Sequence, residues 1–388
     1  MRAKKLVNNL YSKKETFAKF IHENYSNKPL IKLDNNILNK ELKLSLNYLV
    51  DNWEKGFYKL KHKMYFSPQL GFKSTPLQVG DIFQRAIIAT HFKTIVNNID
   101  AYELKDIINF EKEYLKSNKY NEVGWKYFPD LLELPCDSDD LAQIMQVFTG
   151  SNQEEIESLF KTPLTKLLKN SNEPLFKTWI YSTENNELEM QSTKNEWGDT
   201  HDVDVISNIG YAIFSNLNVL NFLVRNKSLE ILKKNAIFVS NRQHKKGYWE
   251  STWYDDVYYG TYVSTRFLNS FQQHSDSVDK ALMFLKKNQN VNGSWGNLKK
   301  KNLLNTAIVL LTFYESKKEE SYKEAIVKGA EYILSNKNID GSYSSDNFIK
   351  MEVGRSKDLP NKILYYKSDV LTTSYCLTAL SYVYRKET

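Results

Sequence analysis

Apolar residues recur every three or four positions along most of the chain, and this period predicts α-helices. The pattern is clearest in the C-terminal half, where an apolar helical segment, a polar turn with glycine and an aromatic residue follow one another three times. The three copies are AIFVSNRQHKKGYW, ALMFLKKNQNVNGSW and AEYILSNKNIDGSY, at residues 236–249, 281–295 and 330–343. A unit of this kind cannot bury its apolar face alone, so we expect the copies to pack side by side.

The turn residues of the three copies have clear physical roles. Gly247, Gly293 and Gly341 lie 46 and 48 residues apart, a length that suits two helices and two turns per repeat. Glycine in such a turn adopts a positive φ at little cost. An amide residue precedes each glycine and is expected to bond carbonyls left free at the helix end. These amides are Gln243, Gln289 and, aligned with them, Asn336, and the aromatic residues that follow are Trp249, Trp295 and Tyr343.

Each turn is followed by a second apolar helix with small and polar residues on one face, at residues 255–271, 303–316 and 368–384. Ser368-Asp369 and Asn305-Thr306 are typical of the starts of these inner helices. Earlier copies are degenerate. Residues 44–58, with Trp53 and Gly56, are a candidate first copy, and residues 80–92, 139–148 and 203–224 predict further buried helices. Loops are expected between these helices at 67–78, 122–135 and 181–201. Long loops at one mouth of a barrel usually carry function.

Composition agrees with a helical barrel. The chain has 388 residues, 41% of them hydrophobic and 13% aromatic, with only 14 glycines and 8 prolines. We therefore predict an all-α fold, an α/α barrel at residues 41–388 preceded by a helical extension at residues 1–40. The net charge of +7 indicates a lysine-rich surface, or alternatively attraction to anionic lipid or to a diphosphate. No run of like charges suggests a nucleic-acid partner.

The cysteines and the N-terminal segment bear on the compartment of the protein and on its cross-links. The two cysteines, Cys136 and Cys376, form neither a disulfide framework nor a zinc motif, which fits a cytoplasmic setting. The N-terminus has no apolar stretch typical of a signal peptide, and no run of about 18 apolar residues predicts a membrane span. Peripheral contact with a membrane stays open as an alternative.

The Q-x-x-x-G-x-W units resemble the QW motifs of squalene-hopene cyclases, class II terpene cyclases and, more loosely, prenyltransferase β subunits. The resemblance covers roughly residues 45–388 and implies the α/α barrel of that family. It says little about the reaction, because this fold also hosts unrelated functions.

The segment Pro135-Cys136-Asp137-Ser138-Asp139-Asp140-Leu141-Ala142 looks like the D-x-D-D motif of class II terpene cyclases. The match implies that Asp139 is the catalytic acid and that Asp137 and Asp140 flank it, although Leu141 stands where threonine is usual. Protonating an alkene or epoxide requires a carboxylic acid that keeps its proton near neutral pH, whereas a lone aspartate ionises near pH 3.9. Clustered carboxylates in an apolar cavity meet that need. The alternative is ordinary helix capping.

Three further groups are candidate substrate-binding residues, each with a structural alternative. Asp204 and Asn208, one helical turn apart, predict a polar pair at the cavity or a metal site, or otherwise a capped inner helix. Asp255 and Asp256 are expected to open another inner helix, with Tyr258, Tyr259 and Tyr262 on the cavity wall or in the core. The third group is the aromatic part of the loop before the acid cluster, Trp125, Tyr127 and Phe128.

Cofactor motifs are missing from the sequence. It has no D-D-x-x-D, P-loop, G-x-G-x-x-G, H-E-x-x-H or prenyltransferase-type zinc pattern, so we predict no certain cofactor and Mg²⁺ only for a diphosphate substrate. Class II cyclases usually pair two helical barrels, whereas this chain has length for one. Three alternatives follow: the chain's own loops close the site, a second copy or a partner protein closes it, or the barrel does other work.

The function predicted is acid-initiated cyclisation of a small-molecule isoprenoid. A non-catalytic barrel that binds a lipid or peptide, and a carbohydrate-active barrel with Asp139 and Asp204 as acid and base, are the alternatives.

Overall fold

The computed structural model describes residues 37–66, 72, 76–99, 101–121, 123–170, 175–181, 187–299, 302–353 and 362–383. The longer helices are α2 (Ile37–Glu54), α3 (Ile82–Ile99), α4 (Leu104–Ser117), α5 (Ser138–Phe148), α6 (Gln153–Asn170), α8 (Val203–Asn216), α9 (Phe222–Asn241), α10 (Tyr258–Leu268), α11 (Ser275–Lys287), α12 (Leu303–Glu315), α13 (Lys323–Ser335) and α14 (Asp369–Val383). The shorter elements are α7 (Glu187–Ser192), β1 (His62–Tyr65), β2 (Leu77–Gly80), β3 (Cys136–Asp137), β4 (Trp179–Ile180), β5 (Asn347–Val353) and β6 (Lys362–Lys367).

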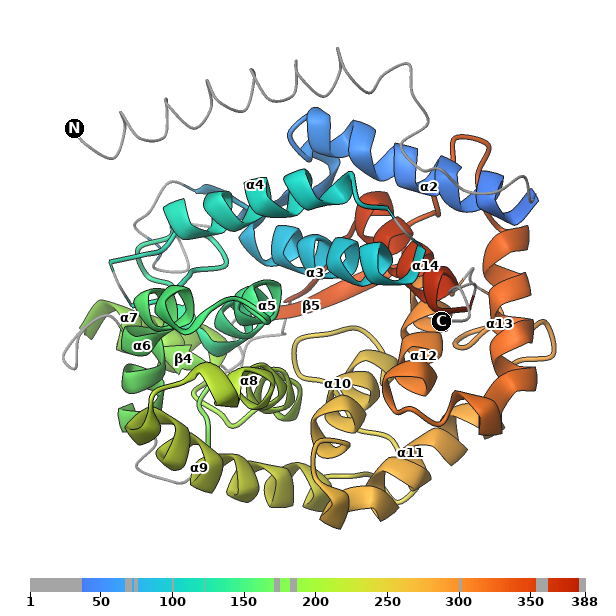
Figure 1. Ribbon diagram of the computed structural model, residues 1–388. Coiled ribbons are helices and arrows are strands. Elements are labelled where there is room, and N and C mark those ends of the chain that lie inside the picture. The colour runs from blue at the N-terminus through green and yellow to red at the C-terminus, as the bar shows by residue number, and fades with distance from the viewer. Residues whose placement is uncertain are drawn as a thin grey trace.

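The helices form two concentric rings (Figure 1). In the described part of the chain, the inner ring consists of α3, α5, α8, α10, α12 and α14, and each of these contacts the next until α14 returns to α3. The outer ring consists of α2, α4, α6, α9, α11 and α13. The chain thus alternates between the rings, and the predicted α/α barrel is confirmed.

The two rings differ in burial as their sequences predict. Inner helix α14 is buried on every side from Val370 to Ser381, as expected of a helix that is apolar all round. Outer helix α11 buries one stripe, Val278, Ala281, Leu282 and Leu285, and exposes the rest. The spacing of that stripe is the three- and four-residue period seen in the sequence.

The three predicted turns share one hydrogen-bond pattern. Around Gly293, the Asn290 N–H donates to the Ser294 carbonyl (2.8 Å) and the Gly293 N–H to the Asn290 carbonyl (2.9 Å). Gly293 has φ 87°, and a Cβ there would lie 2.3 Å from the Lys328 carbonyl oxygen, so the turn requires glycine. The indole of Trp295 donates to the Leu285 carbonyl at the end of the outer helix (2.6 Å).

The same pattern joins the rings at every copy. The backbone N–H of each turn aromatic donates to a threonine hydroxyl of the following inner helix. The pairs are Trp249 with Thr261 (3.2 Å), Trp295 with Thr306 (3.2 Å) and Tyr343 with Thr373 (2.9 Å).

The structure corrects the alignment of the third copy by one residue. Gln289 donates to the carbonyls of Gly293 (3.0 Å) and Ala325 (2.8 Å), and Gln243 makes the matching bonds in the first copy. The residue four positions before Gly341 is Lys337, and its ammonium group reaches the carboxylate of Glu41 on α2. Asn336 instead caps the end of α13, where its amide donates to the Tyr332 carbonyl (2.9 Å).

Trp125 belongs to a further copy of the turn that the sequence disguised. Its indole donates to the Leu115 carbonyl ten residues earlier (2.7 Å), as Trp295 does to Leu285. The Tyr120 N–H donates to the Gly124 carbonyl (2.7 Å) and the Val123 N–H to the Tyr120 carbonyl (2.8 Å), which repeats the turn. The glycine is shifted by one position, and this hid the match. Trp53, proposed as a first copy, lies inside α2 and donates to Glu111 (2.8 Å).

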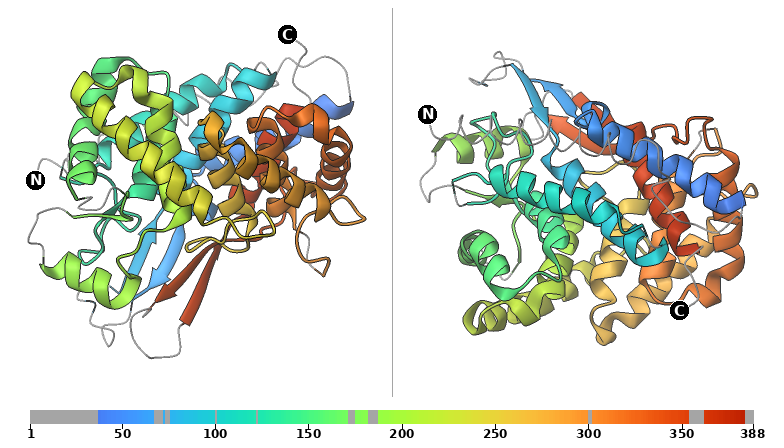
Figure 2. Two further views of the ribbon diagram at one scale, coloured as in Figure 1. Left: turned by 90° about the horizontal axis from the view of Figure 1, so that it is seen from below. Right: turned by 45° about the horizontal axis from the view of Figure 1, so that its top comes forward.

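Three two-stranded antiparallel pieces supplement the predicted helices. β1 pairs with β2, β3 with β4, and β5 with β6, and Figure 2 shows the first and third as hairpins that project from the same end of the barrel. The segment 181–201, expected to be a loop, contains α7 and a further helical turn at Thr193–Trp197. Most of the predicted extension (1–36) and of the loop at 67–78 lies outside the described residues, so the domain boundary at residue 40 stays a prediction.

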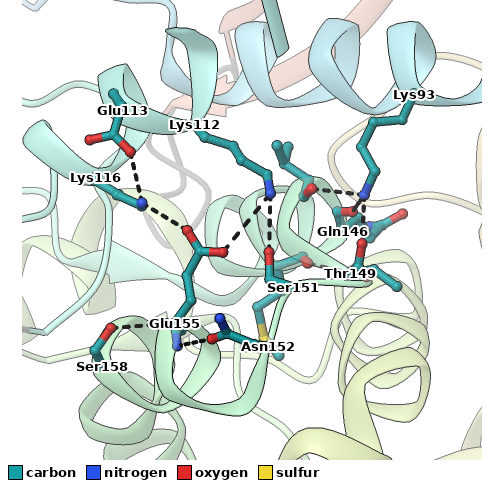
Figure 3. A network of polar contacts seen from close by, with 12 residues as sticks. Lys93, Lys112, Glu113, Lys116, Gln146, Thr149, Ser151, Asn152, Glu155 and Ser158 are labelled. Atoms are coloured by element: carbon teal, nitrogen blue, oxygen red, sulfur yellow. Dashed lines mark hydrogen bonds and ion pairs between the residues drawn. The ribbon is translucent and has the colours of Figure 1, made fainter. Parts of the chain in front are cut away.

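A partly buried lysine holds the C-terminal end of α5. Figure 3 shows Lys93 of α3 pointing to the last turn of α5, where it donates to the carbonyls of Gln146 (3.1 Å), Val147 (2.8 Å) and Thr149 (2.9 Å). Burial lowers the pKa of Lys93 to about 8. A cation is favourable where carbonyls are left free at a helix end. The helix that carries the acid cluster is therefore anchored at its far end.

Candidate active site

The acid cluster opens α5, and its three carboxyl groups have different surroundings. Asp137 is the N-cap of the helix, and its side chain accepts from the Asp140 N–H (2.7 Å). The Ser138 N–H donates to the Thr178 carbonyl (2.8 Å), which ties this helix start to β4. The capping alternative therefore holds for Asp137, a usual position for aspartate.

Asp139 does not cap the helix. Its Oδ1 accepts from the amide of Asn208 on α8 (2.7 Å), and its Oδ2 accepts from the Tyr254 hydroxyl. Burial raises the pKa of Asp139 well above its usual range, the two hydrogen bonds oppose that rise, and the negative charges of Asp137 and Asp204 add to it. Asp139 thus combines a tendency to hold its proton with two donors that stabilise the carboxylate after the proton leaves.

Asp140 is completely buried beside Asp137. Burial raises the pKa of both carboxyls, that of Asp137 to about 6. A hydrogen bond between the two side chains raises the pKa of Asp140 and opposes the rise of Asp137. Neither carboxyl oxygen of Asp140 accepts a hydrogen bond from a described donor, whereas its protonated form can donate to Asp137. Because two adjacent buried carboxylates cannot both ionise cheaply, the pair keeps one proton.

The raised pKa values predict that Asp140→Asn stabilises the protein at alkaline pH. A carboxyl whose pKa is raised on folding binds more protons in the folded chain, so stability falls as pH rises from about 4 through 6. Replacing Asp140 should remove part of this fall. We expect equal stability at pH 4 and a gain on the order of 1–3 kcal/mol at pH 8 by urea denaturation. Asp255→Asn is the control, and a loss of stability in Asp140→Asn at pH 8 would contradict the pairing.

A cavity lies directly over the acid cluster. It encloses about 540 Å³ of space between atoms, counting its mouth. Its described polar lining consists of Asp137, Asp139 and Thr178. Seven of the other lining residues are aromatic: Phe83, Tyr127, Phe128, Trp179, Trp197, Trp253 and Tyr254. The aliphatic ones are Leu134, Val205, Ile349 and Met351.

The structure separates the three aromatic residues predicted before the cluster. Tyr127 and Phe128 line the cavity, and the Tyr127 hydroxyl accepts from Gln84 (2.5 Å) and contacts His62 Nδ1 (2.9 Å). Trp125 does not reach the described lining, because its indole packs against Phe160 and bonds the end of α4.

Asp204 and Asn208 do not form the expected polar pair. Asp204 Oδ2 accepts from the Ser251 hydroxyl (2.5 Å) and from the backbone of Thr252 and Trp253 (both 3.0 Å). It therefore holds the segment that carries the cavity residues Trp253 and Tyr254. Asn208, by contrast, directly contacts Asp139.

The third candidate group divides in the same way. α10 begins at Tyr258 rather than at Asp255, because residues 254 and 255 pair with β5 through the bridge Tyr254–Ile349 and the bond from Asp255 N–H to the Phe348 carbonyl (2.8 Å). Asp255 and the exposed Asp256 (φ 65°) are outside the described cavity lining.

The tyrosines of α10 lie behind the cavity wall. The ring of Tyr259 is tilted by 35° against that of Tyr254, with 3.9 Å between ring centroids, and its hydroxyl accepts from Asn208 and Gln143 (both 3.2 Å). Tyr262 lies one turn further on and donates to Glu315 (2.9 Å). Tyr258 is also buried.

Several residues of the site were not singled out from the sequence. Tyr254 directly precedes Asp255 and Asp256, and of these three residues the sequence prediction named only the acidic pair. Trp197 comes from a segment expected to be a loop, whereas Trp179 of β4 and Ile349 and Met351 of the hairpin β5–β6 belong to elements that were not predicted. The only sequence signal for the tyrosine and the two tryptophans was their aromatic character.

Two negative observations concern the described residues alone. No three His, Cys, Asp or Glu side chains among them gather in a way that could hold a metal ion. No helix among them is long and apolar enough to cross a membrane.

Comparison with known proteins gives matches for one part of the sequence and for the whole fold. Residues 211–348 match the family model of the squalene-hopene cyclase C-terminal domain. No curated protein matches the sequence. Type II terpene cyclase MstE from Scytonema, solved with geranylgeranyl dihydroxybenzoate as substrate, is 15% identical, covers 89% of this chain and 96% of its own, and gives a TM-score of 0.63.

More distant structures share the fold as well. ent-Copalyl diphosphate synthase from Streptomyces platensis is 16% identical over 77% of this chain and 50% of its own, with a TM-score of 0.55. A glycosyl hydrolase family 88 protein from Bacteroides vulgatus is 9% identical over 90% and 99%, with a TM-score of 0.52.

The fold is therefore that of the terpene-cyclase-type α/α barrels. Within this class, residues 211–348 are similar to the squalene-hopene cyclase C-terminal domain, and the fold is similar to that of type II terpene cyclases, as the QW-like turns predicted.

Proposed function

We propose that the protein is an enzyme that cyclises an isoprenoid by protonating a carbon–carbon double bond or an epoxide with Asp139. The observation that carries the proposal is a buried carboxyl with a raised pKa at the base of a cavity lined by seven aromatic residues. A buried acid that keeps its proton near neutral pH suits this step, because a normal aspartate would be ionised.

The hydrogen bonds of Asp139 define where the proton is held. Asn208 donates to Oδ1, so the proton belongs on Oδ2. Oδ2 has two lone-pair directions, of which one accepts from Tyr254 and the other is free to carry the proton into the cavity. When the proton forms the new C–H bond of an alkene, or the new O–H bond of an epoxide as its C–O bond breaks, Tyr254 and Asn208 remain as donors to the carboxylate and stabilise it.

The aromatic lining suits the cation that follows protonation. Trp253 makes edge contacts with Trp179 at 5.7 Å and is tilted toward Trp197 at 6.2 Å between ring centroids. Each aromatic face stabilises a nearby cation by roughly 0.5–2 kcal/mol. The substrate chain would fold against these rings, and a proton lost to solvent or to a base would end the sequence with a product isomeric with the substrate.

The described lining contains no lysine or arginine. A diphosphate or other anionic head, if the substrate has one, would therefore lie beyond this lining, and Mg²⁺ is expected to assist only in that case. MstE and the copalyl diphosphate synthase support the class of substrate, since the former was solved with a geranylgeranyl compound.

The two alternatives gain less support. A carbohydrate-active site would use Asp139 and Asp204 on facing walls, but Asp204 is engaged with the 251–253 backbone. A purely binding barrel has no need of a buried acid cluster, which costs stability.

The test is incubation of the purified chain with squalene, with C15 and C20 prenyl diphosphates and with geranylgeranyl dihydroxybenzoate, each with Mg²⁺ and with EDTA. Mass spectrometry of the extracts should detect a new compound isomeric with one substrate. Binding of a substrate without any conversion would favour the binding barrel instead.

A further inference from the structure

Asn208 contacts the proposed acid Asp139, and a second polar residue controls the orientation of Asn208. Arg266 of α10 donates from Nη2 to the Asn208 carbonyl oxygen (3.1 Å). Its side chain is 9% exposed, so this bond lies in the interior of the barrel. Arg266 itself is not part of the described cavity lining.

Arg266 is held firmly in place. Its guanidinium group lies over the ring of Tyr211, 4.2 Å from the centroid, and donates from Nη1 to the Tyr262 hydroxyl (3.0 Å). The Tyr262 hydroxyl in turn donates to Glu315 Oε1 (2.9 Å), whose other carboxyl oxygen lies 3.8 Å from Nη1. A planar guanidinium stacked and bonded in this way has few alternative orientations.

The guanidinium group of Arg266 can only donate hydrogen bonds, and this fixes the orientation of the Asn208 amide. If the amide turned by 180°, its NH₂ group would face the guanidinium, and two donors would oppose each other. The flipped amide would also present its carbonyl oxygen to Asp139 Oδ1. Because Arg266 can only donate, it excludes this orientation.

We propose that Arg266 is a positioning residue that sets, through Asn208, which carboxyl oxygen of Asp139 carries the proton. With Arg266 in place, Asn208 donates to Oδ1 and the proton is confined to Oδ2, on the side where Tyr254 and the cavity lie. Without it, the amide can turn, and the proton can then also lie on Oδ1, where it points at Asn208. The catalytic consequence rests on the proposed function, whereas the position of the proton does not.

The test is infrared spectroscopy of the substrate-free chain labelled with ¹³C-aspartate, titrated with acid and base. The band of protonated Asp139 is identified by its loss in Asp139→Asn. Other groups around Asp139 that can titrate or carry charge are Asp137, Asp140, Asp204, Tyr254 and Tyr259, and all remain in the variants compared.

Arg266→Gln supplies both a donor and an acceptor to Asn208, whereas Arg266→Lys remains donor-only and is the matched control. We expect one Asp139 band in the wild type and in Arg266→Lys. In Arg266→Gln we expect a second band and an upward shift of the titration midpoint, because the flipped amide favours the neutral acid. With any substrate that is converted, kcat should fall about tenfold with KM unchanged.

Indirect action through Asn208 is tested by a double variant. In an Asn208→Ala background, Arg266→Gln should add no further change to the Asp139 band. A single unshifted band in folded Arg266→Gln, or a split band in Arg266→Lys, would overturn the proposal. If Arg266→Gln does not fold, the proposal is tested with Arg266→Lys and with the ¹⁵N spectrum of the wild-type Asn208 amide. The protons of that amide should exchange slowly with solvent, and their signals should shift as Asp139 titrates. Fast exchange with no shift would refute the proposal.

Discussion

Asp139→Asn is expected to abolish conversion of the substrate while leaving the fold intact. The asparagine amide has nearly the same shape and can still bond Asn208 and Tyr254, but it cannot donate a proton to an alkene. General acids typically contribute 10²–10⁴-fold to rate, and an acid that initiates the reaction is indispensable, so we expect a loss of about 10³-fold or more. The measurement is product formation by mass spectrometry, with circular dichroism for the fold.

Asp255→Asn is the matched control for this variant. Asp255 also precedes an inner helix and was a candidate from the sequence, but it lies outside the described cavity lining. It should keep wild-type turnover. Equal activity of Asp139→Asn and Asp255→Asn would remove Asp139 from the mechanism.

Trp295→Ala is expected to cause the largest loss of stability among single substitutions in the repeats. The indole is fully buried, donates to the Leu285 carbonyl and packs against Phe313, with 6.1 Å between ring centroids. Truncating a buried tryptophan to alanine costs about 3–5 kcal/mol, through lost burial and the cavity that remains. Here the lost bond to a helix-end carbonyl adds to that cost. Urea denaturation followed by circular dichroism measures it.

Met283→Ala controls for removal of a large apolar side chain from the same region. Met283 lies on α11 but is 66% exposed, so its truncation should change stability by about 0.5 kcal/mol or less. If Trp295→Ala cost as little as Met283→Ala, the turns would not be the elements that join the two rings.

Much of the fold could be predicted because its signals are local. The period of apolar residues and the Gly-aromatic turns depend on residues a few positions apart, so 236–249 and 281–295 could be recognised directly. The copy at Trp125 escaped because its glycine is displaced by one position, and Asn336 was misaligned because Lys337 replaces the glutamine. Lys337 occupies the glutamine position because its side chain reaches Glu41 on α2. That contact is distant in sequence, so no local pattern predicts it.

The candidate site was predictable only at its centre. The carboxyl cluster at 137–140 is contiguous in sequence, so its three aspartates could be recognised as a group. The partners of Asp139 come from positions 69 and 115 residues away, Asn208 and Tyr254. Their approach depends on ring closure, on the hold of Asp204 on the 251–253 segment and on the insertion of β5 beside Tyr254. These are tertiary effects that no local pattern carries.

Cyclisation in D₂O tests the central claim most directly, because the proposal requires a solvent-derived proton from Asp139 to become part of the product. The chain is equilibrated in D₂O, given the substrate that it converts, and the product is analysed by mass spectrometry. With an alkene substrate, the account predicts a product isomeric with the substrate that carries one deuterium, from the new C–D bond formed at initiation, and no such product from Asp139→Asn. From an alkene substrate, a product without deuterium, or one that has lost a diphosphate, would contradict it.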